Sequence, residues 1–381
     1  MTHLPFKYSS NIDKRKHIQD LTNAYDVWHE NSNLYTNAHR IPDCFLDKKY
    51  PAYHAQESAD VINADRSKIK FFIIIQESLR FIDNKKPELT IPSLSYLKAD
   101  CTYIFITGDN FNADDFPIYN GNGEKLSYIN IYFPWWIYWL TPVDFSDPTY
   151  NYSLTGYNKF YDFYSKKTVD FISLMGTMRP ERQYLVRKLY PKLYKKICAV
   201  SIADELLGHT EIFDHDFDYT PQQFWGDRSV FKKLSVAHSL PIDLYNQAKL
   251  NLVVETQIAY DSVDNFFVTE KTIKSLFTGI PFILYGAKNF LSNLRKIGFK
   301  TYSTLWNEDY DSLPTHKERA KAIVKLISNL ENFDWQAAIP ELERIHYHNL
   351  KLLNNRNKIV TPAFLNLEHK IIEIINQVES A

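Results

Sequence analysis

The chain has 381 residues, which predicts two domains, because single hydrophobic cores rarely grow beyond about 250 residues. Hydrophobic residues make up 45% of the chain and charged residues 23%, proportions that exclude a disordered or collagen-like protein. The 44 basic residues are balanced by 45 acidic ones, so the chain lacks the overall positive charge typical of a dedicated DNA-binding protein. This balance does not exclude a local basic groove.

Cysteine usage and the N-terminal sequence favour the cytoplasm. Cys44, Cys101 and Cys198 fit no zinc-binding spacing, and the first residues lack the basic and apolar regions of a signal peptide. Residues 126–143 carry no charge and reach the lower limit of a membrane span. They contain two prolines, however, and most of their bulk is aromatic. We therefore expect a buried strand and turn, or an aromatic platform, and no transmembrane segment.

Short apolar runs predict an α/β protein. In the first half, 69–75 and 102–107 are rich in β-branched and aromatic residues, as are strands buried on both faces of a parallel sheet. In the second half, strands and helices alternate. The predicted strands are 169–174, 195–201, 250–254, 266–268 and 281–285, and the predicted helices are 180–190, 240–249, 269–278, 317–329 and 361–378, the last capped by Thr361 and Pro362.

This pattern predicts two α/β domains facing a cleft, with a helical C-terminus. We place an acceptor-side domain at 1–160, a donor-binding domain at 161–345 and a C-terminal helical segment at 346–381. A ligand of such a protein binds between the domains.

The segment 264–286 carries the clearest site signal. Thr269 stands where a helix N-cap is needed, and Gly279 stands where the same helix should end. Glu270 and Lys271 then lie in the first turn, at the carboxyl end of a strand, where open α/β sheets bind ligands. A cation there is disfavoured by about 0.3–1 kcal/mol unless an anion binds beside it, and a diphosphate would be such an anion.

A second predicted helix start, at 175–182, also follows a strand and also carries cations. Arg179 and Arg182 could each hold phosphate oxygens with two hydrogen bonds. The alternatives stay open at this point: a solvated Lys271 beside a capping glutamate, and surface arginines paired with acids such as Glu181. Two such helix starts in one half favour a phosphate site.

Several segments resemble the α-1,3-fucosyltransferase family. FVTEKTIKSLFTGIPFILYG resembles its donor-binding motif, and LPIDLYNQAKLNLVVETQ and FISLMGTMRPERQYLVRKL are similar to the segments that precede it. YIFITGDN and YINIYFPWWIYWL resemble first-half segments more loosely. The resemblance implies a GT-B fold with two Rossmann-like domains, an inverting reaction, no metal, and no cofactor besides a GDP- or UDP-linked sugar as co-substrate.

The resemblance also implies roles for individual residues. Glu270 would bind the donor ribose, and Lys271 and Arg182 the diphosphate. Further donor-site residues would be Arg179, Thr269, Lys249, Asn251 and Glu255. Asp109 would be the general base where the family has a glutamate, and Tyr132 or Phe133 replaces the family's arginine before Pro134, which leaves the donor sugar and the acceptor open.

Inversion requires a carboxylate that removes the proton of the acceptor hydroxyl. Asp109, after the predicted strand 102–107, is the preferred base, and Glu77 is the rival. Trp135 and Trp136 either stack on the acceptor or belong to the core. The acidic run Asp214-His215-Asp216-Phe217-Asp218 is expected to be a solvated loop, and His346 and His348 are expected at the surface.

The sequence thus predicts a cytoplasmic, fucosyltransferase-like glycosyltransferase that moves a sugar from a nucleotide diphosphate to a glycan hydroxyl. One alternative is transfer to hydroxymethylated bases in DNA, which a small basic groove and an aromatic pocket for a flipped base could support. The other is a nucleotide-sugar-binding protein without catalysis.

Overall fold

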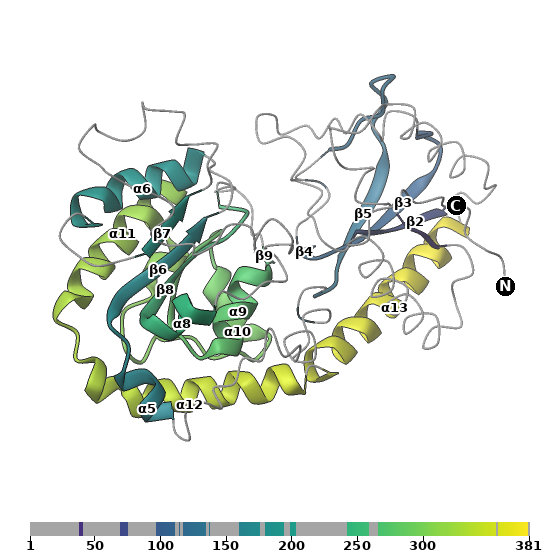
Figure 1. Ribbon diagram of the computed structural model, residues 1–381. Coiled ribbons are helices and arrows are strands. Elements are labelled where there is room, and N and C mark those ends of the chain that lie inside the picture. The colour runs from purple at the N-terminus through teal and green to yellow at the C-terminus, as the bar shows by residue number, and fades with distance from the viewer. Residues whose placement is uncertain are drawn as a thin grey trace, which may run out of the picture.

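The fold is given by a computed structural model of the chain (Figure 1). The residues that it describes are 38–40, 69–74, 97–110, 114, 117–134, 137, 160–175, 180–193, 199–202, 242–258, 266–355 and 357–379. Several residues singled out by the sequence lie outside the described residues: Glu77, Trp135, Trp136, Arg179 and the acidic run 214–218.

The first half contains a four-stranded parallel sheet. Its strands are β1 (Ala38–Arg40), β2 (Ile69–Ile74), β3 (Thr102–Thr107) and β5 (Ser127–Tyr132), in the order β1-β2-β3-β5. The centre of β3 is completely buried, as its uninterrupted apolar sequence predicts. Both strands predicted in this half are confirmed. The uncharged run 126–143 begins as strand β5, and no helix in the described ranges is long and apolar enough to cross a membrane.

The second half contains another four-stranded parallel sheet, in the order β10-β8-β6-β7. Its strands are β6 (Val169–Met175), β7 (Ala199–Ile202), β8 (Ala248–Val254) and β10 (Phe282–Tyr285). From β6 the chain moves to β7 on one side, then returns across the sheet to β8 and β10 on the other side. The direction of winding therefore reverses between the neighbouring strands β6 and β8. In open α/β sheets, ligands bind outside the carboxyl ends of the strands at such a switch point.

Helices cover both faces of this second sheet (Figure 1). On one face α6 (Pro180–Leu193) packs against α11 (His316–Asn329), and on the other lie α8 (Ile242–Gln247), α9 (Glu270–Thr278) and α10 (Phe290–Lys296). All of these helices except α10 were predicted from the sequence, to within a few residues at their ends. The resulting three-layer unit places the first turns of α6 and α9 near the carboxyl edge of the sheet.

A small two-stranded ladder and the C-terminal helices connect the two halves. Strand β4 (Asp109–Asn110), just after β3, pairs antiparallel with β9 (Phe266–Phe267), just before α9. Helix α12 (Trp335–Asn354) packs on α9 and on α5 (Phe160–Ser165) in the second half. Helix α13 (Asn357–Glu379) then runs to the first half, where it contacts β5 (Figure 1). The predicted boundary at 345/346 thus falls inside α12.

Two local predictions near the C-terminus are wrong. The last helix begins at Asn357, so Thr361 and Pro362 lie within it and do not form its cap. His346 is buried, with 2% of its surface exposed, because α12 brings it against α5, where its ring stacks on Phe160 at a centroid distance of 5.3 Å. His348 is half-buried, and its Nε2 lies 2.8 Å from the carbonyl oxygen of Gly298.

Candidate functional site

Helix α9 begins and ends as its sequence predicts. Thr269 is its N-cap, with extended backbone, and its hydroxyl oxygen accepts a hydrogen bond from the amide of Lys271 at 3.3 Å. Gly279 ends the helix in the left-handed conformation, with φ 71°. Both predictions are confirmed, and they place Glu270 and Lys271 in the first turn.

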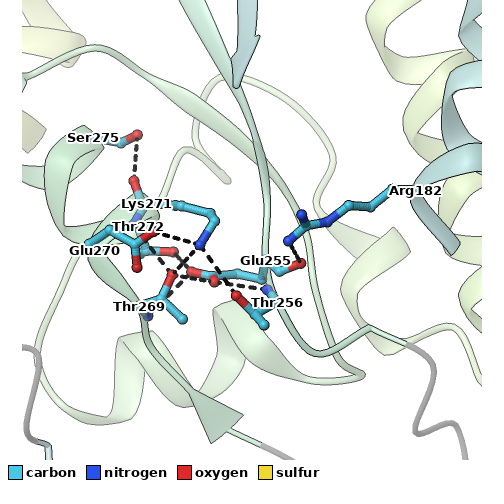
Figure 2. Close-up of polar contacts among 8 residues, drawn as sticks. All are labelled: Arg182, Glu255, Thr256, Thr269, Glu270, Lys271, Thr272 and Ser275. Carbon is cyan, nitrogen blue, oxygen red and sulfur yellow. Dashed lines mark hydrogen bonds and ion pairs between the residues drawn. The ribbon is translucent and has the colours of Figure 1, made fainter. Parts of the chain in front are cut away.

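Glu255 fixes this first turn to the carboxyl end of β8. Its carboxylate is completely buried and accepts hydrogen bonds from the Thr269 hydroxyl, at 2.6 Å, and from the Thr272 hydroxyl (Figure 2). Burial raises the pKa of Glu255, while the positive charge of Lys271 and the two hydroxyl hydrogen bonds oppose that rise. Glu255 therefore orients α9 from below its N-terminus.

Lys271 lies in a cluster of oxygen acceptors. Its Nζ is 2.7 Å from Oε1 of Glu270, 3.3 Å from the Thr256 hydroxyl and 3.4 Å from the Thr269 hydroxyl. The side chains of Lys271 and Glu270 are 23% and 12% exposed, so an external ligand can reach both. The protein's own carboxylate thus neutralises the cation in the first turn, and a phosphate partner for Lys271 stays a prediction.

The charges around Glu270 favour its ionised form. Burial alone would raise the pKa of Glu270, but Lys271 and Lys274 outweigh it, and the pKa lies below its ordinary value. Lys274 is itself buried, which lowers its pKa to about 8 despite the attraction of Glu270.

Arg182 reaches the same point from the opposite side. It lies in the first turn of α6, is buried, and its Nη2 donates to the carbonyl oxygen of Glu255 at 3.1 Å. Figure 2 shows Arg182 approaching from one side of the Glu255 and Thr256 backbone and Lys271 approaching from the other. The two cations that the sequence assigned to one diphosphate therefore contact two consecutive residues.

Asp109 lies at the junction of the two halves. Its backbone pairs with Phe267, and its amide donates to the Thr107 hydroxyl oxygen at 3.2 Å. Its carbonyl oxygen accepts a hydrogen bond from Nδ2 of Asn130 at 2.8 Å. The side chain is completely buried. Burial and the charge of Asp109 raise the pKa of the Tyr132 hydroxyl, which places that phenol near the carboxylate. Its role as a general base stays a prediction.

Two predicted donor-site residues lie elsewhere. Lys249 is six residues before Glu255 on β8, which separates them by about 20 Å along the strand. Its Nζ is 3.4 Å from Oδ1 of Asp170. Asn251 is buried between β8 and α9, and its Nδ2 donates to the Ser275 hydroxyl at 2.7 Å. The structure therefore groups Arg182, Glu255, Thr269, Glu270 and Lys271, without Lys249 or Asn251.

Three further residues that interact with this group were missed in the sequence. Thr256 follows Glu255 directly, Thr272 is one helical turn after Thr269, and Lys274 is four residues after Glu270. The last two spacings place side chains on one face of a helix, so helical periodicity could have identified them. Within the described ranges, no group of three or more His, Cys, Asp or Glu side chains could hold a metal ion.

The chain has few detectable relatives. No protein-family model matches it, and no curated protein is significantly similar. One similar solved structure is the DNA-modifying enzyme β-glucosyltransferase, studied with and without uridine diphosphoglucose, at 13% identity over 83% of this chain and 76% of that one, with a TM-score of 0.39. Another is a glycosyltransferase from Rickettsia africae ESF-5, at 12% identity over 86% and 83%, with a TM-score of 0.35. TM-scores this low establish neither a shared fold nor a shared function.

Proposed function

We propose that the protein is a glycosyltransferase that binds a nucleotide diphosphate sugar at the carboxyl ends of β6 and β8. The observation that carries this proposal is the convergence of Arg182 and Lys271, from two helix N-termini, on the consecutive residues Glu255 and Thr256. That point lies at the switch point of the second sheet.

The charges of the site suit a diphosphate. Arg182, Lys271 and Lys274 are opposed by Glu255 and Glu270, so the group carries three positive and at most two negative charges, a net charge of at least +1. Backbone amides at the start of α9 add partial positive charge, as at other anion-binding helix N-termini. The partly exposed Lys271 is the cation that would contact the phosphates, while Arg182 would hold the backbone at Glu255 beside them.

The other predicted donor-site residues would bind the rest of the donor or support the site. Glu270 would accept hydrogen bonds from hydroxyl groups of the donor, ribose included, as the family resemblance implies. Arg179, just before α6, would add a second guanidinium. Lys249 and Asn251 would act only indirectly, through the packing of β8 and α9. The donor would be GDP- or UDP-linked.

The proposed reaction is an inverting transfer. The acceptor hydroxyl loses its proton to Asp109 while its oxygen bonds to the anomeric carbon, and the bond from that carbon to the diphosphate oxygen breaks. Lys271 and Arg182 stabilise the negative charge of the departing diphosphate, so the chain's own cations supply the role that a metal has in other transferases. Because Asp109 is completely buried, this step requires the acceptor to enter at the β4–β9 junction. Glu77 is the alternative base.

Donor binding provides the first test. In a panel of GDP, UDP, CMP and dTDP and their sugar conjugates, we expect GDP or UDP to raise the melting temperature, with a stabilisation of about 3 kcal/mol at a hundredfold excess over Kd. Lys271→Ala should abolish the shift. Lys321→Ala, at an exposed position on α11, should leave it unchanged. A wild-type protein that responds to no member of the panel would contradict the proposal.

Turnover then separates an enzyme from a binding protein. Release of the nucleotide diphosphate is measured with oligosaccharide acceptors and with duplex DNA containing hydroxymethylcytosine. We expect a glycan to be the acceptor in a fucosyltransferase-like reaction, and turnover only on DNA would instead favour the DNA-modifying alternative. Asp109→Asn should retain donor binding and lose transfer, whereas a non-catalytic binding protein would release nothing with any acceptor.

A further inference from the structure

Two lysines act on the carboxylate of Glu270. Lys271 contacts it directly at 2.7 Å, and Lys274 lies one turn further along α9. Both lysines lower the pKa of Glu270 against the effect of burial. The site therefore holds an ionised carboxylate that is in contact with Lys271 and is also stabilised by the charge of Lys274 on the same helix.

The two lysines differ in what can reach them. Lys274, with 5% of its surface exposed, is one of the buried residues of α9, so a ligand from solution does not reach it. The side chain of Lys271 is 23% exposed and is shared among Glu270 and the hydroxyls of Thr256 and Thr269. An anion from solution can thus bind Lys271, and at that position it meets the negative charge of Glu270 (Figure 2).

We propose that Glu270 sets the ligand selectivity of this site by competing with the ligand's phosphates for Lys271. A bare anion would have to displace Glu270 and leave its carboxylate with an unmet acceptor, which costs free energy. A ligand that also brings hydroxyl groups donates hydrogen bonds to the displaced carboxylate and offsets that cost. This inference rests on the proposed function and specifies it: the site selects hydroxyl-bearing diphosphates over pyrophosphate.

Lys274 makes the exchange possible. When Lys271 turns to a phosphate, Glu270 keeps a positive charge one turn away, so it stays ionised and remains a strong acceptor. Without that second cation, a half-buried carboxylate that had lost its partner would tend to take up a proton. Lys274 is therefore a positioning residue for Glu270, and it needs no contact with the ligand.

Titration calorimetry with Glu270→Gln tests the competition. Glutamine keeps the shape of the side chain and removes its charge. We expect inorganic pyrophosphate to bind about fivefold more tightly to Glu270→Gln than to the wild type, because the variant no longer has a carboxylate that competes for Lys271. The nucleoside diphosphate that the wild type prefers should bind no more tightly. Glu331→Gln, at an exposed position between α11 and α12, should change neither affinity.

A ligand series on the wild-type protein tests the same idea without a variant. The preferred nucleoside diphosphate is compared with its 2′,3′-dideoxy form, which lacks the ribose hydroxyls. We expect the dideoxy form to bind at least about fivefold more weakly to the wild type, a difference that Glu270→Gln should largely remove.

The outcomes distinguish this inference from the proposed function. If Glu270→Gln weakens pyrophosphate binding or leaves it unchanged, or if the wild type binds the dideoxy form as well as the parent, the competition is wrong while donor binding stands. If the wild type binds no nucleoside diphosphate at all, the proposed function fails and this inference fails with it.

Discussion

Asp109 on β4 is paired with Phe267 on β9, two residues before the Thr269 cap of α9. The residue predicted to remove the acceptor proton is therefore joined by a two-residue ladder to the strand that precedes the helix predicted to hold the donor. Their separation depends on that pairing and on the turn after β3. A change that shifts the turn should alter catalysis more than donor binding.

Asn130→Ala provides a direct test of this dependence. Asn130 on β5 donates to the carbonyl oxygen of Asp109 at 2.8 Å and accepts from the Thr107 hydroxyl at 2.8 Å. Loss of a buried hydrogen-bonded partner costs about 1–3 kcal/mol of stability. We expect kcat to fall at least about tenfold with donor Kd unchanged, because misplacing a reacting group slows the chemical step. Ser127→Ala, exposed on the same strand, is the control, and a loss of donor affinity instead of kcat would contradict this role.

The C-terminus of α9 should tolerate no side chain at Gly279. This residue has φ 71°, and an added Cβ would lie 2.5 Å from Nδ1 of His346 on α12. The left-handed backbone alone costs an alanine about 1–2 kcal/mol, and the contact with the buried ring adds to that cost. Gly123 has a similar φ of 77° with no atom within 4 Å of its added Cβ. In chemical denaturation Gly279→Ala should therefore destabilise the protein clearly more than Gly123→Ala. Equal losses would show that the ring moves aside without cost.

His346 should make the fold sensitive to mild acid. Neither ring nitrogen has a hydrogen-bond partner within the part of the chain that the structure describes, and burial lowers the pKa of His346 to about 4. The unfolded chain takes up this proton near pH 6.5 and the folded one only near pH 4, so stability is retained above pH 6.5 and lost as the pH falls towards 4. The loss from this group is on the order of 3 kcal/mol.

Comparing variants isolates that contribution. The free energy of unfolding is measured between pH 4 and pH 7 for the wild type, for His346→Leu and for His369→Gln, the last at an exposed position on α13. We expect His346→Leu to have a flatter pH profile and His369→Gln to retain the wild-type slope. An unchanged slope in His346→Leu would refute the assignment.

The parts of the fold that the sequence predicted are those with local causes. The apolar runs of β2, β3 and β10 predict strands, and those of β3 and β10 are buried. The start and end of α9 are encoded in Thr269 and Gly279. Helix α12 was not predicted, because its burial depends on α5 and α9, far away in the chain. His346 was assigned to the surface for the same reason: the Phe160 ring that covers it lies outside any local pattern.

In the candidate site, too, features with local causes were predicted, and features that depend on packing between distant segments were not. Glu270, Lys271 and Arg182 could be placed near one another because strand ends of a parallel sheet share one edge. What the sequence could not show is that Glu255 is turned inward to Thr269 and Thr272, since that depends on how β8 and α9 pack. Glu255 was predicted as a donor ligand, and its contacts in the structure are those of a residue that holds the helix.

Glu255 should make both the stability of the protein and its donor affinity depend on the state of one buried carboxyl group. Burial raises the pKa of Glu255, so the folded protein binds its proton more tightly than the unfolded chain does. Stability from this group is therefore fully present below the unfolded pKa of about 4.3 and is lost as the pH rises through the higher folded value. Glu255→Gln cannot ionise, so it should remove this loss, and the difference in unfolding free energy between variant and wild type should shift in favour of the variant with rising pH. Donor affinity should fall in the variant. Glutamine keeps one acceptor oxygen, so it can accept from only one of the Thr269 and Thr272 hydroxyls, and the first turn of α9 loosens. A variant that binds donor normally would show that α9 is oriented by its packing and not by Glu255.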